Sequence, residues 1–396
     1  MKEHPKVAIY SGVSFSTTFI ERLIKGLAEA DVTIYIFGVN TGTPLQHKNI
    51  RYIVYGKRWH KLLILIKYSC LLFLFKPKAK KKLDRRIIAR RKNTYFWKLK
   101  YYPVLYHQPD IFHIQWAKSI KDWIWVKDFG MKLVVSLRGT HITISPKTNV
   151  YWENLYLKYF PCVDGFHAVS NSLADEILNY NIINKRARVV KSGVDIKTLN
   201  YFEKATLHST LKILSIGRSH FTKGYKYGLD AISKFQQLGG KFHYTIIGVE
   251  NNEALLFQRA QLGLENNITF KDALSFYEVQ KAIQNADVLL LPSVEEGIAN
   301  VVLEAMALGT LVVSTDCGGM KEVVLPKQTG YLVPVRDAQA MALALKEVSE
   351  LPLETYQRIT QQARAFVEAN HSEAQMVSGM LGLYKRLMLE GPDKVN

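Results

Sequence analysis

Short runs of β-branched residues alternate with stretches of helical periodicity along nearly the whole chain. This alternation is typical of an α/β protein whose parallel sheets are covered by helices on both faces. The runs fall into two series. The first predicts strands at 7–12, 32–38, 111–115, 133–137, 165–169 and 188–191, and the second predicts strands at 211–217, 242–248, 268–270, 288–291 and 311–314.

A polar stretch without strong periodicity, residues 195–210, separates the two series and is interpreted as a linker. A chain of 396 residues is long enough for two domains of about 100–200 residues each. We therefore predict two Rossmann-like domains, at 1–200 and 201–371, and a last helix within 372–396 that packs back on the first domain. Ligands of open α/β sheets bind beyond the carboxyl ends of the strands.

The positive charge of the chain is concentrated in one segment. Residues 51–100 carry seventeen Lys and Arg and one acid, so they supply +16 of the net charge of +19. The apolar part, Trp59–Phe75, is interpreted either as a buried helix or as membrane-inserted. The cationic part that follows, 76–92, is either a solvated face or a surface for anionic lipid. We predict that the basic amphipathic insertion at 57–100 binds an anionic membrane surface, and that nucleic acid is not a partner.

The three cysteines, Cys70, Cys162 and Cys317, are far apart in the chain, which argues against a zinc site and against a disulfide framework. The longest apolar run, 62–75, is interrupted by Lys67 and is shorter than the ~20 residues that span a bilayer. The N-terminus lacks the pattern of a secretory signal. We expect a cytoplasmic protein with no membrane-spanning segment.

The densest chemical signal lies at 292–324. A loop with Glu296 and Gly297 follows the strand at 288–291, and a helix is predicted from Asn300 to Leu308. Unpaired N–H groups at a helix N-terminus suit a phosphate or a sugar placed against 297–302, and Glu304 can project toward the same ligand.

A second signal, GRSHFTKG at Gly217–Gly224, follows the first strand of the second series. Arg218 and Lys223 in this loop can neutralise charge that builds on a diphosphate leaving group. The pair Gly318-Gly319 is either an ordinary turn or a third loop at the same edge of the sheet.

In combination these motifs resemble the retaining glycosyltransferases of family 4. Glu296 and Glu304 are followed by EAMALG and GGMKE, and Gly217, Arg218 and Lys223 match the family's G-R-x-x-x-x-K-G element. The segments Ala168–Ser170, Gly193–Asp195 and Ser14–Ile20 match further landmarks of the family. The resemblance implies the GT-B fold, in which two Rossmann-like domains face each other across a deep cleft. It is strongest to members that assemble bacterial capsule, exopolysaccharide or lipopolysaccharide.

The resemblance also implies an activity and its residues. The sugar of a nucleotide sugar moves with retention to a glycan acceptor, here expected to be lipid-linked, and neither a metal nor a cofactor beyond the nucleotide sugar is required. Arg218, Lys223 and Glu296 are the implied catalytic residues. The implied donor-binding residues are Gly217, Gly297, Ile298, Ala299, Asn300, Val301 and Glu304, the last of which holds the ribose.

The first domain departs from the family pattern. Many members have a histidine after the strand at 133–137, where this chain has Arg138. Arg138 is assigned to the donor, through phosphate or sugar hydroxyls, and His141 or His113 are alternatives for the missing histidine. Gly12, Thr18 and His113 are the candidates for the first loop and the acceptor, although His113 also fits a core histidine of a strand.

Two other functions stay open from the sequence. A sugar-nucleotide epimerase can share this fold, and a catalytically silent membrane-bound scaffold is compatible with Arg138. Neither the base and sugar of the donor nor the acceptor can be read from side-chain identity.

Overall fold

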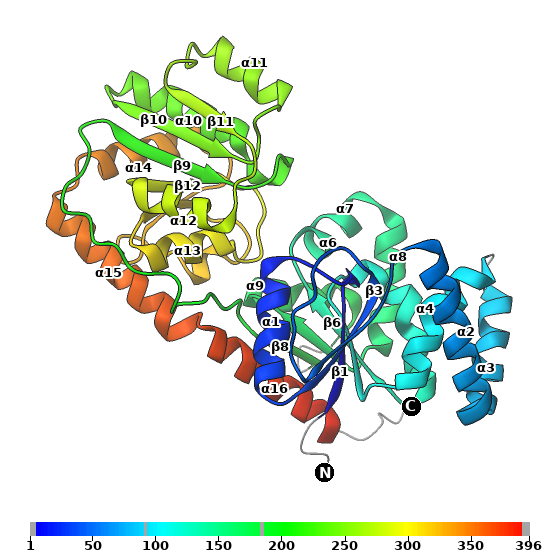
Figure 1. Ribbon diagram of the computed structural model, residues 1–396. Coiled ribbons are helices and arrows are strands. Elements are labelled where there is room, and N and C mark those ends of the chain that lie inside the picture. The colour runs from blue at the N-terminus through cyan, green and yellow to red at the C-terminus, as the bar shows by residue number, and fades with distance from the viewer. Residues whose placement is uncertain (1–4, 91–92, 183–185, 390–396) are drawn as a thin grey trace. The chain divides into compact units, whose positions relative to one another are not determined.

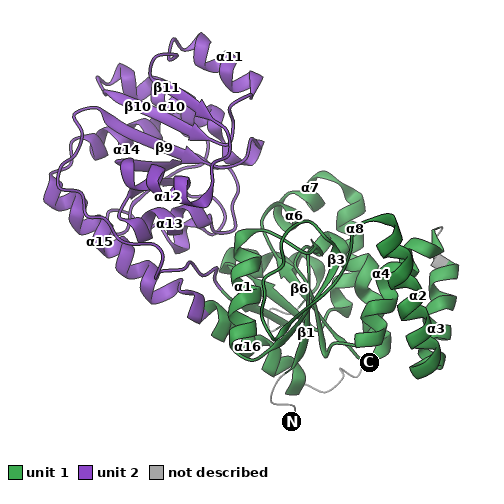
Figure 2. Ribbon diagram, in the orientation of Figure 1, with its two compact units in different colours: residues 1–190, 376–396 green, residues 191–375 purple. Residues whose placement is uncertain are grey.

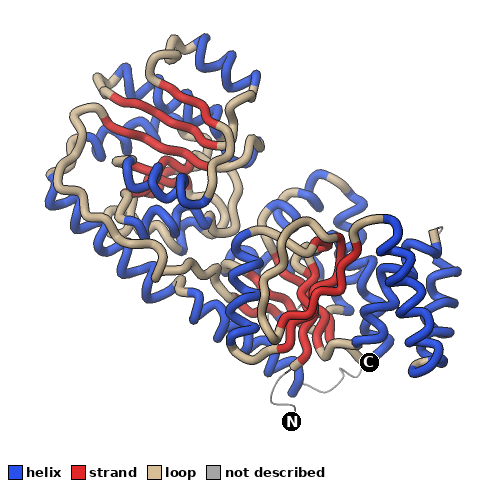
Figure 3. Tube along the Cα trace, viewed as in Figure 1, coloured by secondary structure: helices blue, strands red, loops and turns tan. Residues whose placement is uncertain are grey.

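The computed structural model describes residues 5–90, 93–182 and 186–389. The chain forms two compact units, which Figure 1 shows by element and Figure 2 by colour: unit 1 comprises residues 1–190 and 376–396, and unit 2 comprises 191–375. Each unit is a parallel sheet with helices on both faces, as the tube in Figure 3 shows. The predicted α/β class with two Rossmann-like domains is confirmed.

The sheet of unit 1 has the order β4-β3-β1-β5-β6-β7-β8, with the short β2 also paired to β3. Its central strands are apolar on both faces, which is the composition expected of a doubly covered parallel sheet. The strand order reverses between β1 and β5. The bounds are β1 Lys6–Tyr10, β2 Gly12–Val13, β3 Thr33–Val39, β4 Ile50–Tyr55, β5 Ile111–Ile114, β6 Lys132–Leu137, β7 Gly165–Ala168 and β8 Ala187–Val189.

Two apolar clusters fill the two sides of this sheet. One is closed by α1 (Thr18–Glu29) and the C-terminal helix α16 (Glu373–Leu389), whose Met380, Leu383 and Leu387 are buried beside β1. The C-terminal helix is thus part of the core of unit 1. The helices on the other side and at the sheet edge are α5 Ile120–Trp123, α6 Thr140–Thr143, α7 Ser145–Thr148, α8 Val150–Tyr159 and α9 Asn171–Asp175.

The basic insertion forms three helices, α2 (Arg58–Phe75), α3 (Pro77–Arg90) and α4 (Thr94–His107), which pack against one another. On α2 only Ile64, Tyr68 and Leu72 are buried, and the rest of this apolar helix is exposed or partly exposed. A fully buried helix, one of the two interpretations of Trp59–Phe75, is therefore not what the structure contains.

Unit 2 has a sheet of order β11-β10-β9-β12-β13-β14, which is the doubly wound order 3-2-1-4-5-6. Its strands are β9 Leu211–Ile216, β10 Phe242–Ile247, β11 Ile268–Lys271, β12 Val288–Leu291, β13 Leu311–Thr315 and β14 Tyr331–Val333. Its helices are α10 Tyr225–Gln237, α11 Glu253–Gln261, α12 Phe276–Asn285, α13 Asn300–Leu308, α14 Ala338–Ser349 and α15 Leu353–Asn370. The order reverses between β9 and β12, so the loops that follow these two strands share the edge where doubly wound sheets bind ligands.

The boundary between the units lies at residue 190, earlier than the predicted 200. Val194 forms a bridge with Ser372, and Leu199 is fully buried in the core of unit 2. The Arg364 guanidinium also donates to the carbonyl oxygens of Leu199 and Ala307. Because these contacts are all made within unit 2, the start of the supposed linker is a folded part of that unit.

Candidate functional site

The loops after β9 and β12 lie side by side because their strands are hydrogen-bonded neighbours, with Ile213 paired to Val288. The first loop carries Arg218 and Lys223, and the second carries Glu296 and Gly297. The structure therefore brings together, at the reversal point of the unit 2 sheet, two motifs that are about seventy residues apart in the chain.

An ion pair joins the two loops. Lys223 Nζ lies 2.6 Å from Glu296 Oε1, and the hydroxyl of Ser293 donates to the same oxygen at 2.9 Å. The two charged side chains are mostly buried, with exposed fractions of 21% and 15%. Both partners are thus held in place by the protein and still reach its surface, as a ligand-binding pair must.

Glycine allows the two loops to approach this closely. Gly224 has φ +63°, and a Cβ at this position would lie 1.9 Å from the carbonyl oxygen of Pro292. The backbone N–H of Val294 donates to the carbonyl of Thr222 at 2.7 Å across the same contact. The position of Lys223 beside Glu296 therefore depends on the absence of a side chain at residue 224.

Gly224→Ala is expected to destabilise unit 2 by about 3 kcal/mol, because a left-handed backbone conformation costs ~1–2 kcal/mol and overpacking costs ~1–3 kcal/mol. The matched control is Gly239→Ala, since Gly239 has φ +79° and a Cβ there would meet nothing within 4 Å. Calorimetric unfolding of both variants separates backbone strain from the clash. Equal losses in the two variants would contradict the close approach.

A third loop completes the site. Gly318 has φ +55°, and a Cβ there would lie 1.7 Å from the carbonyl oxygen of Glu296. The N–H of Gly319 donates to the carbonyl of Gly297 at 2.9 Å. Of the two interpretations of this glycine pair, the structure favours a loop that packs against the site over an ordinary turn.

The loop that carries Glu296 and Gly297 leads directly into the N-terminus of α13. Ala299 is the N-cap residue, and no side chain caps the helix. Gly297, Ile298 and Ala299 are buried, while Asn300 and Val301 are partly exposed. Asn300 Oδ1 is buried without a hydrogen-bond partner in the part of the chain that the structure describes. Backbone N–H groups and the helix dipole together favour an anionic or strongly polar ligand here.

Glu304 and Arg218 are close in sequence to the Lys223–Glu296 ion pair, but neither is one of its two partners. Glu304 is on α13, one turn after Asn300, and is partly exposed. Arg218 directly follows Gly217 at the end of β9 and is exposed, and its side chain makes no ion pair among the described residues. A Cβ on Gly217 would lie 3.0 Å from Lys223 Cε, so this glycine leaves room for the lysine.

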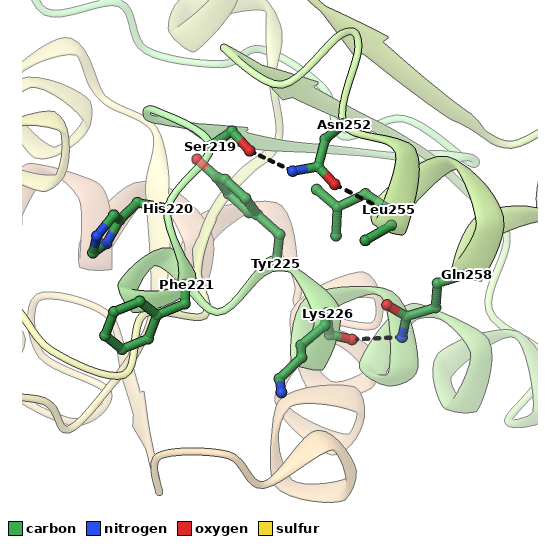
Figure 4. Close-up of a pocket in the computed structure, with 9 residues that line it drawn as sticks. Ser219, His220, Phe221, Tyr225, Lys226, Asn252, Leu255 and Gln258 are labelled. Carbon is green, nitrogen blue, oxygen red and sulfur yellow. Dashed lines mark hydrogen bonds between the residues drawn. The ribbon is translucent and has the colours of Figure 1, made fainter.

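A pocket of about 340 Å³ lies beside the loop after β9, between that loop and α11 (Figure 4). Asn252 organises it: its Nδ2 donates to Ser219 Oγ at 2.5 Å, and its Oδ1 accepts from the N–H of Leu255. The other labelled lining residues are His220, Phe221, Tyr225, Lys226 and Gln258. Lys223 and Glu296 do not line this pocket.

In unit 1 the first-loop candidates are found at the carboxyl edge of the sheet. Gly12 is in β2 with φ +95°, and Thr18 is the exposed first residue of α1. Between them, the hydroxyl of Ser14 accepts from the N–H of Thr41, and the carboxylate of Glu21 accepts from the N–H of Ser16. Burial raises the pKa of Glu21. The loop is thus held to the body of unit 1 at both ends.

His113 belongs to a buried chain of hydrogen bonds. Burial lowers the pKa of His167 to about 3 and that of His113 well below its usual value, so both imidazoles are neutral. The carbonyl of Val190 accepts a hydrogen bond from His167 Nε2, so the proton of this imidazole is on Nε2. The Nδ1 atom of His167 therefore accepts from the Ser136 hydroxyl. Ser136 then accepts from His113 Nε2 at 2.8 Å, and His113 Nδ1 accepts from the Tyr384 hydroxyl at 2.7 Å.

Because His113 is fully buried and both its ring nitrogens are hydrogen-bonded, it acts as a core residue of unit 1. The assignment of His113 to the acceptor needs correction for this reason: both ring nitrogens are already hydrogen-bonded to side chains of unit 1, so the imidazole has no free polar atom for a ligand. Arg138, in contrast, is half-buried at the end of β6 and donates to Gln115 Oε1 at 3.1 Å.

Sequence reasoning missed Ser293 and Gln115. Ser293 directly precedes the VEEG segment, and its small side chain gave no sign that it would bond Glu296. Gln115 ends the predicted strand at 111–115, and a polar residue at the carboxyl end of a central strand is a signal that was available.

Among the described residues, no group of three or more His, Cys, Asp and Glu is arranged to hold a metal ion. In the same part of the chain, no helix combines the length and the apolar character needed to cross a membrane.

Two family models match adjacent parts of the chain. Residues 16–198 match the model of glycosyltransferase family 4, and residues 198–366 match the model of group 1 glycosyl transferases. The loops at Gly217 and Glu296, together with a doubly wound sheet in each unit, define a protein of the GT-B class. Residues 16–198 are thus a glycosyltransferase family 4 domain, and residues 198–366 are a group 1 glycosyl transferase domain.

The amylovoran biosynthesis glycosyltransferase AmsK of Erwinia amylovora is 34% identical over 173 residues, which are 42% of either chain. The matches to the next curated relatives cover 61% and 55% of those proteins, so the chain spans about half the length of the curated relatives it matches.

Solved structures share the fold over nearly the whole chain. A glycosyltransferase from Rickettsia africae superimposes with a TM-score of 0.72 at 18% identity, covering 98% of this chain and 100% of that one. The protein HepE of Anabaena, solved in complex with UDP and glucose, superimposes with a TM-score of 0.69 at 16% identity, covering 97% and 100%.

Proposed function

We propose that this protein is a retaining glycosyltransferase that moves a sugar from a nucleotide sugar to a lipid-linked glycan acceptor in surface-polysaccharide biosynthesis. The observation that carries the proposal is the Lys223–Glu296 pair beside the N-terminus of α13, at the reversal point of the unit 2 sheet. AmsK is named an amylovoran biosynthesis glycosyltransferase, which supports a polysaccharide pathway. HepE was solved in complex with UDP and glucose, the two parts of a nucleotide sugar, which supports a nucleotide-sugar donor.

In this proposal unit 2 binds the donor. The diphosphate lies against Arg218 and Lys223, whose positive charges stabilise the negative charge that develops on the leaving group. An ammonium group has three N–H donors, so Lys223 can contact a phosphate oxygen without losing Glu296. Glu304 holds the ribose, and Glu296 with the backbone at 297–301 orients the sugar.

We further propose that transfer needs no divalent metal, because Arg218 and Lys223 supply the positive charge that a metal supplies in other transferases. Removal of metals with EDTA is then expected to leave the transfer rate within about twofold of the untreated protein. Restoration of a lost activity by added Mg²⁺ or Mn²⁺ would contradict this part of the proposal.

The function is tested by incubating the protein with labelled nucleotide sugars and a membrane extract that contains lipid-linked acceptors. Transfer of label into the organic phase, with the anomeric configuration of the donor kept, is the expected result. An isomerised nucleotide sugar in the absence of acceptor would instead favour an epimerase, and donor binding without any product would favour a scaffold.

We propose that the α2–α3 surface attaches the protein to the cytoplasmic face of the membrane. The outer side of α2 exposes large apolar side chains, among them Trp59, Leu63 and Phe73 with exposed fractions of 78%, 64% and 69%. Exposed cations flank them: Lys57, Arg58, Lys67, Lys78, Lys81 and Arg85. Amphipathic cationic surfaces of this kind bind anionic lipid, with about 1 kcal/mol from each basic residue near the membrane.

Replacing Leu63, Phe73 and Leu74 together with Gln is expected to lower binding to vesicles that contain phosphatidylglycerol by at least about tenfold, because three exposed apolar side chains that would enter the lipid are lost. Flotation with anionic and neutral vesicles measures the effect. The matched control is Leu178→Gln, on an exposed site elsewhere in unit 1. Equal binding to both vesicle types at low and high salt would contradict the electrostatic attachment.

A further inference from the structure

Arg138 and Gln115 occupy the ligand-binding edge of the unit 1 sheet. Gln115 follows β5 and Arg138 follows β6, and these parallel strands are neighbours near the point where the strand order reverses. The guanidinium Nη2 donates to Gln115 Oε1 at 3.1 Å, so the two side chains form one polar pair. Ligands of doubly wound sheets bind at this edge.

Among the described residues, Arg138 forms no ion pair with a carboxylate. Its guanidinium contacts the Gln115 amide and the ring of Phe19, whose centroid lies 4.4 Å from Arg138 Cζ, and it interacts electrostatically with Tyr384. Burial lowers the pKa of the guanidinium to about 9, and no carboxylate is near enough to raise it again. A protein does not bury an unpaired cation without a cost in stability, so the position indicates a role in binding.

The pair also has hydrogen-bond donors that are not used. Arg138 Nε and Gln115 Nε2 are both buried, and neither has a partner among the residues that the structure describes. Gln115 is fully buried. The nearby Ser136 hydroxyl is engaged by His113 and His167, and it lies 3.5 Å from Gln115 Oε1, so it is not a partner of either unused N–H donor. Two side chains that bond each other thus each keep a buried N–H donor that a bound acceptor would satisfy.

We propose that Arg138 and Gln115 form a binding site for an oxyanion carried by a substrate: the carboxylate of an acidic donor sugar or the diphosphate of a lipid-linked acceptor. An oxyanion neutralises the guanidinium and accepts from several N–H groups at once, whereas a neutral sugar hydroxyl does only the second. The inference rests on the proposed function and adds the chemical class of one substrate group.

The first test is calorimetric titration of the full chain with matched pairs of probes. UDP-glucose is compared with UDP-glucuronic acid, and GDP-mannose with GDP-mannuronic acid, for the donor. Farnesol is compared with farnesyl diphosphate for the acceptor. Either among the donor probes or among the acceptor probes, the wild-type protein is expected to bind the probe with the additional anion at least tenfold more tightly than its matched neutral probe.

Two variants test whether Arg138 and Gln115 cause this preference. Arg138→His removes the permanent cation, and Gln115→Glu supplies an internal carboxylate that occupies the guanidinium. Both are expected to reduce the preference for the anionic probe over its neutral counterpart to about twofold or less. Arg51→Gln, on an exposed position of β4, is the control and is expected to keep the preference.

The outcomes distinguish this inference from the proposed function. If nucleotide sugars bind but neither variant changes any anion preference, the oxyanion site is overturned and the proposed function stands. If no nucleotide sugar binds, the proposed function fails, and loss of the farnesyl diphosphate preference in both variants would still support the site. No preference for an anion in either group of probes overturns the inference.

Discussion

Lys223→Ala is expected to lower the rate of sugar transfer by about 10²- to 10³-fold, the usual effect of removing one group that stabilises charge in a transition state. The ammonium is positioned by Glu296 at 2.6 Å and reaches the surface at the edge of the sheet. Its removal takes away a charge on the leaving diphosphate and leaves the Glu296 carboxylate without its ion-pair partner. The measurement is the single-turnover rate with saturating donor.

The matched control for this variant is Lys226→Ala. Lys226 is only three residues away, but it is exposed at the start of α10 and lines the pocket beside α11. We expect its loss to change the rate by no more than about twofold. Lys223→Arg keeps the charge and should retain more activity than Lys223→Ala. If Lys223→Ala and Lys226→Ala have the same rate, Lys223 has no part in the chemistry.

The second large effect is a loss of stability of unit 1 in mild acid. His113 and His167 are buried and neutral in the folded state, since desolvation lowers the pKa of both, and that of His167 to about 3. In the unfolded chain their pKa values are near 6.5, so below that pH the unfolded state binds more protons and is favoured. Between pH 7.5 and 5.0 the two groups should together lower the free energy of unfolding by about 4 kcal/mol.

Tryptophan fluorescence during denaturant unfolding measures this loss in unit 1 alone, because all six tryptophans of the chain lie in that unit. Burial also lowers the pKa of His107 in unit 1, to about 4, so this residue adds to the loss in wild type and variant alike. His167→Gln removes one titrating group, so its loss of stability over the same pH range is expected to be about 2 kcal/mol smaller than that of the wild type. An equal pH dependence in wild type and variant would show that the buried histidine chain does not control acid sensitivity.

The sequence was sufficient to predict elements that are apolar and lie at the centre of a sheet or pack on it. The strand at 288–291 and the helix from Asn300 to Leu308 were predicted with the bounds that the structure has. The strands β4 and β14 were not predicted. The strand β4, at Ile50–Tyr55, is only partly buried and, among the described strands, pairs with β3 alone. The strand β14 has only three residues. Such strands depend on tertiary pairing more than on their own pattern.

For the site, the sequence predicted which residues lie in the loops but not which of them touch. The Lys223–Glu296 contact joins residues that are 73 positions apart, and the roles of Ser293 and Gln115 appear only when neighbouring strands are in register. The apolar segment at Trp59–Phe75 is a similar case. Its composition is apolar on nearly all sides, so only packing could show that one narrow face is buried.

The central claim is that unit 2 binds a nucleotide sugar through the loops after β9 and β12. A thermal-shift screen of nucleotide sugars against the wild-type protein and the Arg218→Ala, Lys223→Ala double variant tests it most directly. We predict that one nucleotide sugar raises the unfolding temperature of the wild type, since a ligand at 100 times its Kd adds about 2.7 kcal/mol, and that the double variant loses this shift. No shift with any nucleotide sugar, or an equal shift in both proteins, would contradict the account.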